Sequence, residues 1–409
     1  MKLLFISNVF PNPIEPTKGV FNEDLVRALA AEQRVEVVSP VSWATELRAC
    51  RPSRIALRRN RDRLTRSGVQ VHHPRYYYPP RILRSAYHLC YWHSTRSTLS
   101  RVVASNRPDV VVGYWADPDG AAAVRLARLL GVPSAIIVGG SDVLVVTANR
   151  QRRRRIASVL QSANAVITLS QDLRARIIDL GVGVGRVHLW ERGVDACFVP
   201  GDRTEARRRL GVDSVGKLVV WVGRLVPVKG LETLFSACQI ARQRGEHFTV
   251  HLVGDGPLRR RLEADRDARG LREMIVFEGA RDHDQLPDWF RAANLTVLPS
   301  WSEGLPNVLR ESLACNTPFV ASRVGGIPEI AGRSDRLFEP GNAIALADAI
   351  RESLSESACR PDRLEPSRPP SWSKSAAALV DILRPLIPEA RAALGGARQR
   401  FVSDYPVQA

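Results

Sequence analysis

The stretch KLVVWVGRLVPVKGLETLFSACQIARQRGEHFTVHLV, residues 217–253, shows the pattern that decides the fold. It opens with the apolar, valine-rich run Lys217–Val222, which predicts a buried strand. A glycine-containing loop follows, and Leu231–Arg242 then spaces its apolar residues as an amphipathic helix does. A second apolar run, Phe248–Val253, completes a strand–helix–strand unit, and such units form parallel sheets.

The same alternation continues to about residue 321 and is also present in the first half of the chain. Two consecutive units of this kind predict an α/β protein with two Rossmann-like, doubly wound domains that face a cleft. We expect domains at 1–195 and 196–354. Residues 355–409 would hold a polar linker, Ser355–Pro370, and a helix, Ala376–Leu383, that packs back on the N-terminal domain.

Length and composition agree with two globular domains. The chain has 409 residues, of which 44% are hydrophobic and 25% charged. No apolar run approaches the roughly 18–20 residues that span a bilayer, and Met1–Asn8 predicts a first strand rather than a signal peptide. The six cysteines have no paired spacing, so neither a zinc site nor a disulfide framework is indicated. The predicted location is the cytoplasm.

The formal charge of +17 is the main compositional deviation. Arginines cluster in the run 152–155 and in a longer stretch made up of Arg48, Arg51, Arg54, Arg58, Arg59, Arg61, Arg63 and Arg66. Such a surface attracts polyanions, either nucleic acid or the anionic inner face of a membrane. The alternative is a solvated surface on an arginine-rich protein.

Two cations follow the strand Lys217–Val222. Arg224 comes directly after Gly223, where the backbone can approach a ligand, and Lys229 precedes Gly230 at the start of the helix. An Arg fork and a Lys point charge suit a pyrophosphate. The alternative is two surface cations on a loop. The next strand end, GDGP at 254–257, permits close backbone approach at Gly254, but is by itself an ordinary strand-to-helix turn.

The most informative motif is PSWSEGLPNVLRE, residues 299–311. Pro306 suits the first turn of a helix, which places Glu303 in the preceding loop and Glu311 on the helix. The amides of Gly304–Asn307 then form an anion-binding helix N-terminus. The two carboxylates flank it and can accept hydrogen bonds from sugar hydroxyls. Alternatively, Glu311 is a solvated helix residue.

In this order the motifs resemble the family-4 retaining glycosyltransferases of the GT-B fold, the glycosyl transferases group 1 type. The resemblance is nearly continuous over residues 190–350 and includes Thr317-Pro318 and Gly325–Glu329. In the first half it is patchier. There Gly19 resembles the glycine of a loop that faces the donor phosphates, and the stretches 115–120 and 140–142 are also similar to the family.

The resemblance implies a retaining hexosyltransferase that moves a sugar from a UDP- or GDP-sugar to a carbohydrate or lipid-linked acceptor, in cell-surface polysaccharide or glycolipid biosynthesis. Arg224 and Lys229 would hold the diphosphate, Glu303 the donor-sugar hydroxyls and Glu311 the ribose hydroxyls. The rest of the nucleotide cradle would be Gly19, Gly223, Gly254, Gly304, Leu305, Pro306 and Asn307. Because cations and amides stabilise the departing diphosphate, we expect neither a metal nor a cofactor.

Two Asp-x-Asp matches, Asp117–Asp119 and Asp282–Asp284, are interpreted as structural, the second as a helix N-cap, with a metal role as the alternative. The chain also departs from the family pattern. Many relatives have a His at the position of Gly139 and an Asn at that of Arg192. Any contact of that His with the donor sugar is then lost or transferred, and Asp142 is the nearest candidate.

Between Ser42 and Ser105 the alternation of strands and helices breaks down. The aromatic residues of this segment either line an acceptor groove or membrane-facing surface, or pack in the core: His72, His73, Tyr76–Tyr78, Tyr87, Tyr91 and Trp92. With basic residues nearby, the segment resembles an interfacial attachment. We therefore hypothesise peripheral contact with the inner membrane face, beside a lipid-linked acceptor.

Three other classes of protein are alternatives. A nucleic-acid-binding module is suggested by charge alone and has no recognition signature, so we expect no nucleic-acid partner. A dinucleotide oxidoreductase is disfavoured because its glycine-rich candidate, Gly181–Gly185, follows a helix rather than a strand. A catalytically silent relative that binds nucleotide or glycan is the alternative suggested by Gly139.

Overall fold

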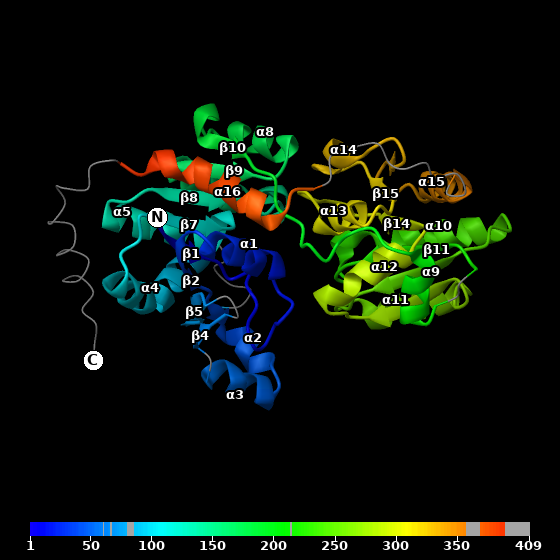
Figure 1. The fold of residues 1–409 in the computed structure, drawn as a ribbon, viewed down its shortest axis with the longest axis horizontal. Coiled ribbons are helices and arrows are strands. Elements are labelled where there is room, and N and C mark those ends of the chain that lie inside the picture. Colours follow the sequence, from blue (N-terminus) through cyan, green and yellow to red (C-terminus); the bar gives the residue numbers. More distant parts are fainter. Residues whose placement is uncertain (60, 66–67, 80–85, 213–214, 357–368, 389–409) are drawn as a thin grey trace. The chain divides into compact units, whose positions relative to one another are not determined.

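A computed structural model describes residues 1–59, 61–65, 68–79, 86–212, 215–356 and 369–388. The chain forms two compact units (Figure 1). Unit 1 contains Met1–Gly193 together with the chain from Trp372, and unit 2 is Val194–Ser371. The chain therefore passes between the units twice. At these crossings the N–H of Val194 donates to the carbonyl of Pro370, at 3.0 Å.

Unit 1 is built on an eight-stranded sheet in the order β10-β9-β8-β7-β1-β2-β5-β4. Neighbouring strands are parallel except for β4 and β5. The strands are β1 (Lys2–Ile6), β2 (Arg34–Val38), β4 (Asp62–Leu64), β5 (Gln70–His72), β7 (Val110–Tyr114), β8 (Ser134–Ile137), β9 (Ala165–Thr168) and β10 (Val187–Leu189). The main helices are α1 (Val20–Ala30), α2 (Trp43–Arg48), α3 (Arg51–Arg59), α4 (Tyr87–Ser105), α5 (Ala121–Leu130), α7 (Arg150–Ser162) and α8 (Gln171–Asp179).

Unit 2 has a six-stranded, all-parallel sheet in the order β13-β12-β11-β14-β15-β16. The strands are β11 (Leu218–Val222), β12 (Thr249–Val253), β13 (Ile275–Gly279), β14 (Leu295–Leu298), β15 (Phe319–Ser322) and β16 (Arg336–Phe338). The helices around it include α9 (Arg203–Leu210), α10 (Leu231–Gln243), α11 (Arg259–Ala268), α12 (Leu286–Ala292), α13 (Asn307–Ala314) and α15 (Ala343–Glu356). The prediction of two doubly wound α/β units is thus confirmed.

Strand β11 shows why its sequence is apolar throughout. Alternate side chains of a strand point to opposite faces of the sheet, and both faces of this one are covered. Val219 and Trp221 pack in the core formed with α10 and α15. Val220 and Val222 pack in the core that includes α12. All five residues of the strand are buried, as is typical of a central parallel strand.

Helix α16 (Trp372–Leu383) belongs to unit 1, where it packs on α1. The indole N–H of Trp190 donates to the carbonyl of Ser375, at 2.8 Å. Trp372 packs so closely on Gly193 that a Cβ there would lie 2.6 Å from the indole ring. The described residues do not include most of the predicted linker, residues 357–368. They also leave out Arg66 and Pro80.

The segment from Ser42 to Ser105 contains more regular structure than the sequence indicated. It holds strand β5 and the 19-residue helix α4. The pattern of α4 is obscured by hydroxyl residues, several of which bond back to a carbonyl one turn earlier, as Thr95 does to Tyr91. Tyr91 and Trp92 are at most 1% exposed. Of the two readings of these aromatics, core packing therefore holds for this pair.

Asp119 is a fully buried carboxyl beyond the carboxyl end of β7. Its Oδ1 accepts hydrogen bonds from the backbone N–H of Asn8, at 2.7 Å, and from the hydroxyl of Tyr91. Its Oδ2 has no partner among the described residues. Burial raises the pKa of Asp119 to about 7, and the two hydrogen bonds offset this only in part. Asp117 pairs with Arg155, at 3.1 Å, so both carboxylates of the first Asp-x-Asp match have structural uses.

We expect Asp119→Asn to change how stability depends on pH. A carboxyl whose pKa is raised from 3.8 to about 7 on folding takes up protons as the chain folds. The free energy of unfolding therefore falls as pH rises through that window, by on the order of 4 kcal/mol from this group. An Asn resembles the protonated carboxyl, so Asp119→Asn should flatten the decline between pH 4 and pH 7. Urea unfolding across this range measures it, and equal slopes for both proteins would show that Asp119 titrates normally.

Among the described residues, none of the helices combines the length and the hydrophobicity that spanning a bilayer requires.

Candidate functional site

The strand order of unit 2 reverses between β11 and β14. From β11 the chain proceeds to β12 and β13 on one side, and then returns to place β14, β15 and β16 on the other side. In such sheets ligands bind outside the carboxyl ends of the strands, at the point where the order reverses. The loops after β11 and β14 therefore form the candidate site.

The loop after β11 is fastened to the loop after β12 by backbone contacts. The N–H of Gly223 donates to the carbonyl of Val253, and the N–H of Leu225 to that of Asp255, both at 3.0 Å. Gly254 has φ of 145°, and a Cβ at this position would lie 1.8 Å from the carbonyl oxygen of Gly223. Only glycine permits this approach. Arg224 projects from the joined loops and is exposed.

The loops after β11 and β14 meet at an ion pair. Lys229 Nζ lies 2.7 Å from Glu303 Oε1, and the two side chains are only 20% and 12% exposed. Partial burial strengthens such a pair and holds both groups in place. The sequence proposed both residues for the site, but nothing in it showed that they touch.

Glycine also sets the spacing of these two loops. Gly230 ends the loop after β11 with φ of 64°, and a Cβ here would lie 2.0 Å from the carbonyl oxygen of Pro299. Next to it, the N–H of Trp301 donates to the carbonyl of Val228, at 2.8 Å. The backbones are therefore in direct contact where Lys229 and Glu303 project.

Helix α13 begins one residue later than predicted. Pro306 occupies the position before the helix, with extended backbone, and the first helical residue is Asn307. Pro306 supplies no side-chain cap to this N-terminus, and the first backbone amides of a helix are groups that can bind an anion. Gly304 is buried, and its carbonyl accepts from the N–H of Gly326, at 2.7 Å. This contact brings the loop after β15 to the same place.

Glu311 lies on α13 and is partly buried, with 13% of its side chain exposed. Its Oε1 lies 3.4 Å from His283 Nε2, and the His283 ring packs edge-on against Phe198. His283 is a neighbour of Glu311 that sequence reasoning missed, because the Asp-x-Asp match around it was considered only as a helix cap or a metal site. That role is also present, since Asp282 and Gln285 form a capping box.

Of the proposed residues, Gly223, Arg224 and Lys229 lie on the loop after β11, Gly254 on the loop after β12, and Glu303 and Gly304–Pro306 on the loop after β14, with Asn307 and Glu311 on helix α13. Lys229 and Glu303 are in direct contact. Gly19 belongs to unit 1. There it precedes α1 with φ of 68°, and a Cβ would lie 2.4 Å from the carbonyl oxygen of Val9. Its glycine identity is thus required by the fold of unit 1 itself.

Asp142 is not free to take over a sugar contact, contrary to the sequence-based suggestion. It is 1% exposed. Its Oδ2 accepts from the N–H of Ala116, at 3.0 Å, and its Oδ1 from that of Gly140, at 2.8 Å. Burial raises the pKa of Asp142, and these backbone hydrogen bonds oppose the rise. Asp142 therefore acts as a structural tie between the loops after β7 and β8.

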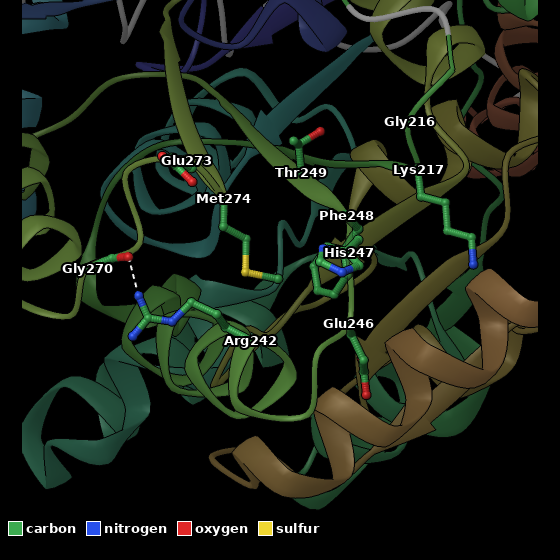
Figure 2. Close-up of a pocket in the computed structure, with 10 residues that line it drawn as sticks. All are labelled: Gly216, Lys217, Arg242, Glu246, His247, Phe248, Thr249, Gly270, Glu273 and Met274. Atoms are coloured by element: carbon green, nitrogen blue, oxygen red, sulfur yellow. Dashed lines mark hydrogen bonds between the residues drawn. The ribbon is translucent and has the colours of Figure 1, made fainter.

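A cavity of about 450 Å³ lies at the opposite edge of the unit-2 sheet. Figure 2 shows its lining, which comes from the amino ends of β11 and β12 and includes Lys217, Phe248 and Thr249. Arg242 donates to the carbonyl of Gly270 at its rim. None of the proposed site residues lines it. Because ligands of parallel sheets bind at the carboxyl ends, we do not assign the site to this cavity.

Two doubly wound α/β units are the architecture of the GT-B glycosyltransferases. The chain belongs to the glycosyl transferases group 1 family. The family model described as "Glycosyl transferases group 1" matches residues 216–356, and that described as "Glycosyl transferase 4-like domain" matches residues 19–193.

The relatives and solved structures agree with this assignment. A putative teichuronic acid biosynthesis glycosyltransferase of Bacillus subtilis is 27% identical over 88% of this chain and 91% of its own length. A D-inositol 3-phosphate glycosyltransferase of Pseudarthrobacter chlorophenolicus is 30% identical over 66% and 68%, respectively. Sucrose-phosphate synthase from Thermosynechococcus elongatus has a TM-score of 0.73 at 21% identity, covering 95% of each chain. The Anabaena protein HepE in complex with UDP-glucose has a TM-score of 0.67 at 18% identity, covering 99% of each.

The contact between Gly230 and Pro299 gives a stability prediction. Gly230→Ala should lower the free energy of unfolding by about 1–3 kcal/mol beyond the cost of a left-handed Ala, because its Cβ overlaps a backbone carbonyl. Gly245→Ala is the matched control, since Gly245 has φ of 74° and no atom within 4 Å of its Cβ position. Chemical unfolding of both variants measures the difference. Equal losses would mean that the two loops are not in contact.

Proposed function

We propose that the protein is a nucleotide-sugar-dependent, retaining and metal-independent hexosyltransferase. The observation that carries the proposal is the Lys229–Glu303 pair at the reversal of strand order in unit 2, 2.7 Å apart and mostly shielded from water. A fixed cation beside a fixed carboxylate matches a ligand in which a diphosphate adjoins a sugar. The donor would be a UDP- or GDP-sugar, and a similar solved structure is a complex with UDP-glucose.

The roles follow from charge development in the reaction. The sugar–phosphate bond breaks and the diphosphate leaves with increased negative charge, so groups that bind it more strongly in the transition state accelerate the step. Lys229 and Arg224 supply positive charge, and the amides before α13 supply donors. This is why the proposed mechanism does not require a metal. Glu303 would accept from sugar hydroxyls and Glu311 from the ribose, while Gly19 of unit 1 would adjoin the phosphates.

The acceptor would be a glycan or a lipid-linked sugar of the cell surface. Support comes from the similarity to a putative teichuronic acid biosynthesis glycosyltransferase, and a D-inositol 3-phosphate glycosyltransferase is a further relative. A catalytically silent nucleotide- or glycan-binding relative is the second candidate, favoured by Gly139 alone.

We also propose that unit 1 contacts an anionic membrane through the outer face of α2, α3 and β4, the basic apolar surface. Its apolar members are Leu47, Ile55 and Leu64, which are 63%, 42% and 66% exposed. Its basic members on α3 are Arg51, Arg58 and Arg59, all exposed, and the helix has no acidic residue in its first turn. Figure 1 shows α3 beyond β4, the last strand of the sheet. Exposed apolar side chains beside arginines are typical of interfacial attachment.

This surface has a fixed base. Leu57 of α3 is fully buried. Glu46 of α2, 4% exposed, pairs with Arg75 at 2.6 Å and with Arg61 at 3.0 Å. The hydrogen bond from Arg75 lowers the pKa of Glu46 to about 2, so the pair persists at any physiological pH.

Nucleotide binding tests the proposed function. The melting temperature of the wild type is measured in EDTA with UDP, GDP, ADP, UDP-glucose and GDP-mannose. We expect the nucleotides of one base to raise it. Lys229→Met should weaken binding of that nucleotide by about tenfold to a hundredfold, because a charge-assisted hydrogen bond to the diphosphate is lost. Lys217→Met is the matched control at the opposite sheet edge, beside the cavity of Figure 2.

Equal weakening by both substitutions would place the nucleotide away from the strand reversal. A wild type that no nucleotide stabilises would remove the basis for the transferase proposal.

Liposome flotation tests the membrane proposal. The wild type should bind vesicles of phosphatidylglycerol and phosphatidylcholine at low salt and detach as salt rises. Arg58→Glu with Arg59→Glu should reduce binding at least about tenfold, since each basic residue near the surface contributes about 1 kcal/mol. Arg260→Glu with Arg261→Glu on α11 makes the same charge change on an exposed helix of unit 2. If both pairs reduce binding equally, attraction is a matter of net charge and the basic apolar surface has no special role.

A further inference from the structure

Unit 1 has a reversal of strand order of its own, between β1 and β7. The loop after β7 begins at Trp115, and the loop after the neighbouring strand β8 contains Gly139. Asp142 ties these two loops together through the N–H groups of Ala116 and Gly140. The same rule that locates the unit-2 site makes this edge a place where a ligand can bind.

Gly139 leaves room for the indole of Trp115. A Cβ at position 139 would lie 2.3 Å from Trp115 Nε1 and 3.0 Å from the hydroxyl oxygen of Tyr114. The backbone of Gly139 is not left-handed, so space rather than conformation requires glycine here. The indole therefore occupies the volume into which a side chain at position 139 would project.

The backbone of Trp115 is held in an unusual conformation. Its φ is 81°, which a residue with a Cβ rarely adopts. Conformations of this kind cost energy, and they concentrate at functional sites, where the surrounding structure enforces them. The Trp115 N–H donates to the carbonyl of Ile137, at 2.9 Å, and Trp115 accepts through its own carbonyl from Gly120, at 2.9 Å. The backbone of Trp115 is thus held in place at the sheet edge.

The Trp115 side chain offers a hydrogen-bond donor that the described residues do not use. The residue is half-buried, and its indole N–H has no acceptor in the described part of the chain. The hydroxyl of the neighbouring Tyr114 already has a partner, because it accepts a hydrogen bond from Arg192 at 3.0 Å. Arg192, 5% exposed, also stacks on Phe21, 4.5 Å from the ring centre. Tyr114 and Arg192 therefore form a fixed backing beside Trp115.

We propose that Trp115 binds a sugar: its ring packs against a pyranose, and its indole N–H donates to one of the sugar's hydroxyls. The proposal rests on the proposed function, because the pyranose belongs either to the nucleotide donor or to the acceptor glycan. A tryptophan combines an apolar body with a polar tip, as a sugar ring requires. Gly139 is the positioning residue that makes room for the indole. Both departures from the family pattern, Gly139 and Arg192, are then parts of one arrangement around Tyr114 and Trp115.

Trp115→Phe tests the hydrogen bond, because it keeps an aromatic ring and removes the N–H. In a donor arm, titration compares the dissociation constants of UDP-glucose and GDP-mannose with those of UDP and GDP. In an acceptor arm, KM is measured for transfer onto octyl glycosides. We expect the dissociation constant or the KM to rise about tenfold in one arm, while the affinity for UDP and GDP stays unchanged. The arm that changes identifies which sugar Trp115 holds. Unchanged values in both arms overturn the proposal, as does an equal loss of UDP or GDP affinity.

Gly139→Ala tests the position of the indole. It should raise the dissociation constant or the KM measured in the same arm by about a hundredfold, because a displaced contact misaligns the substrate. Gly185→Ala is the control, since a Cβ there meets no atom within 4 Å. Gly139→Ala should also lower the melting temperature of the wild type by more than that of Trp115→Ala, where the overlap with the indole is gone and only the approach to the Tyr114 hydroxyl remains. Equal lowering in both backgrounds overturns the proposal. A wild type that binds no nucleotide and transfers no sugar instead refutes the proposed function.

Discussion

The proposed chemistry of unit 2 depends on direct backbone contact between loops that follow different strands. Lys229 and Glu303 can form a shielded ion pair because the carbonyl of Pro299 lies where a Cβ of Gly230 would be. Gly254 permits the same approach to Gly223, and a Cβ at Gly325 would lie 1.9 Å from the carbonyl oxygen of Glu303. All three glycines have positive φ. Arg224, Lys229 and Glu303 therefore project from loops whose spacing is set by the absence of side chains, whereas Glu311 projects from helix α13.

Unit 1 joins its loops by a different means. There, buried carboxylates accept hydrogen bonds from backbone N–H groups across the sheet edge: Asp142 links the loops after β7 and β8, and Asp119 links that after β7 to the end of β1. Carboxylates that accept N–H donors form strong hydrogen bonds, but burial opposes their ionisation, as the raised pKa of Asp119 shows. Trp115 begins the loop after β7, which both carboxylates hold in place. This is why we assign sugar recognition in unit 1 to the side chain of Trp115.

Much of this architecture could be predicted from the sequence. Lys217–Val222 and the strands that follow are short, apolar and separated by amphipathic helices, so the two parallel sheets are confirmed, as is the family. Helix α4 was missed because its serines and threonines mask the apolar face that buries Tyr91 and Trp92. The strand order, and hence the meeting of Lys229 with Glu303, depends on long-range packing that no local pattern contains. The close packing of Trp115 on Gly139 was also hidden, because the two residues lie on different loops.

The roles of Arg224, Lys229, Glu303 and Glu311 stay predictions, and a crystal structure of the protein with the nucleoside diphosphate that it prefers tests them most directly. Our account predicts the diphosphate within hydrogen-bonding distance of Lys229 and Arg224 at the carboxyl ends of β11 and β14, with the ribose on Glu311. A nucleotide bound in the cavity at the amino ends of β11 and β12, or anywhere away from Lys229, would contradict it.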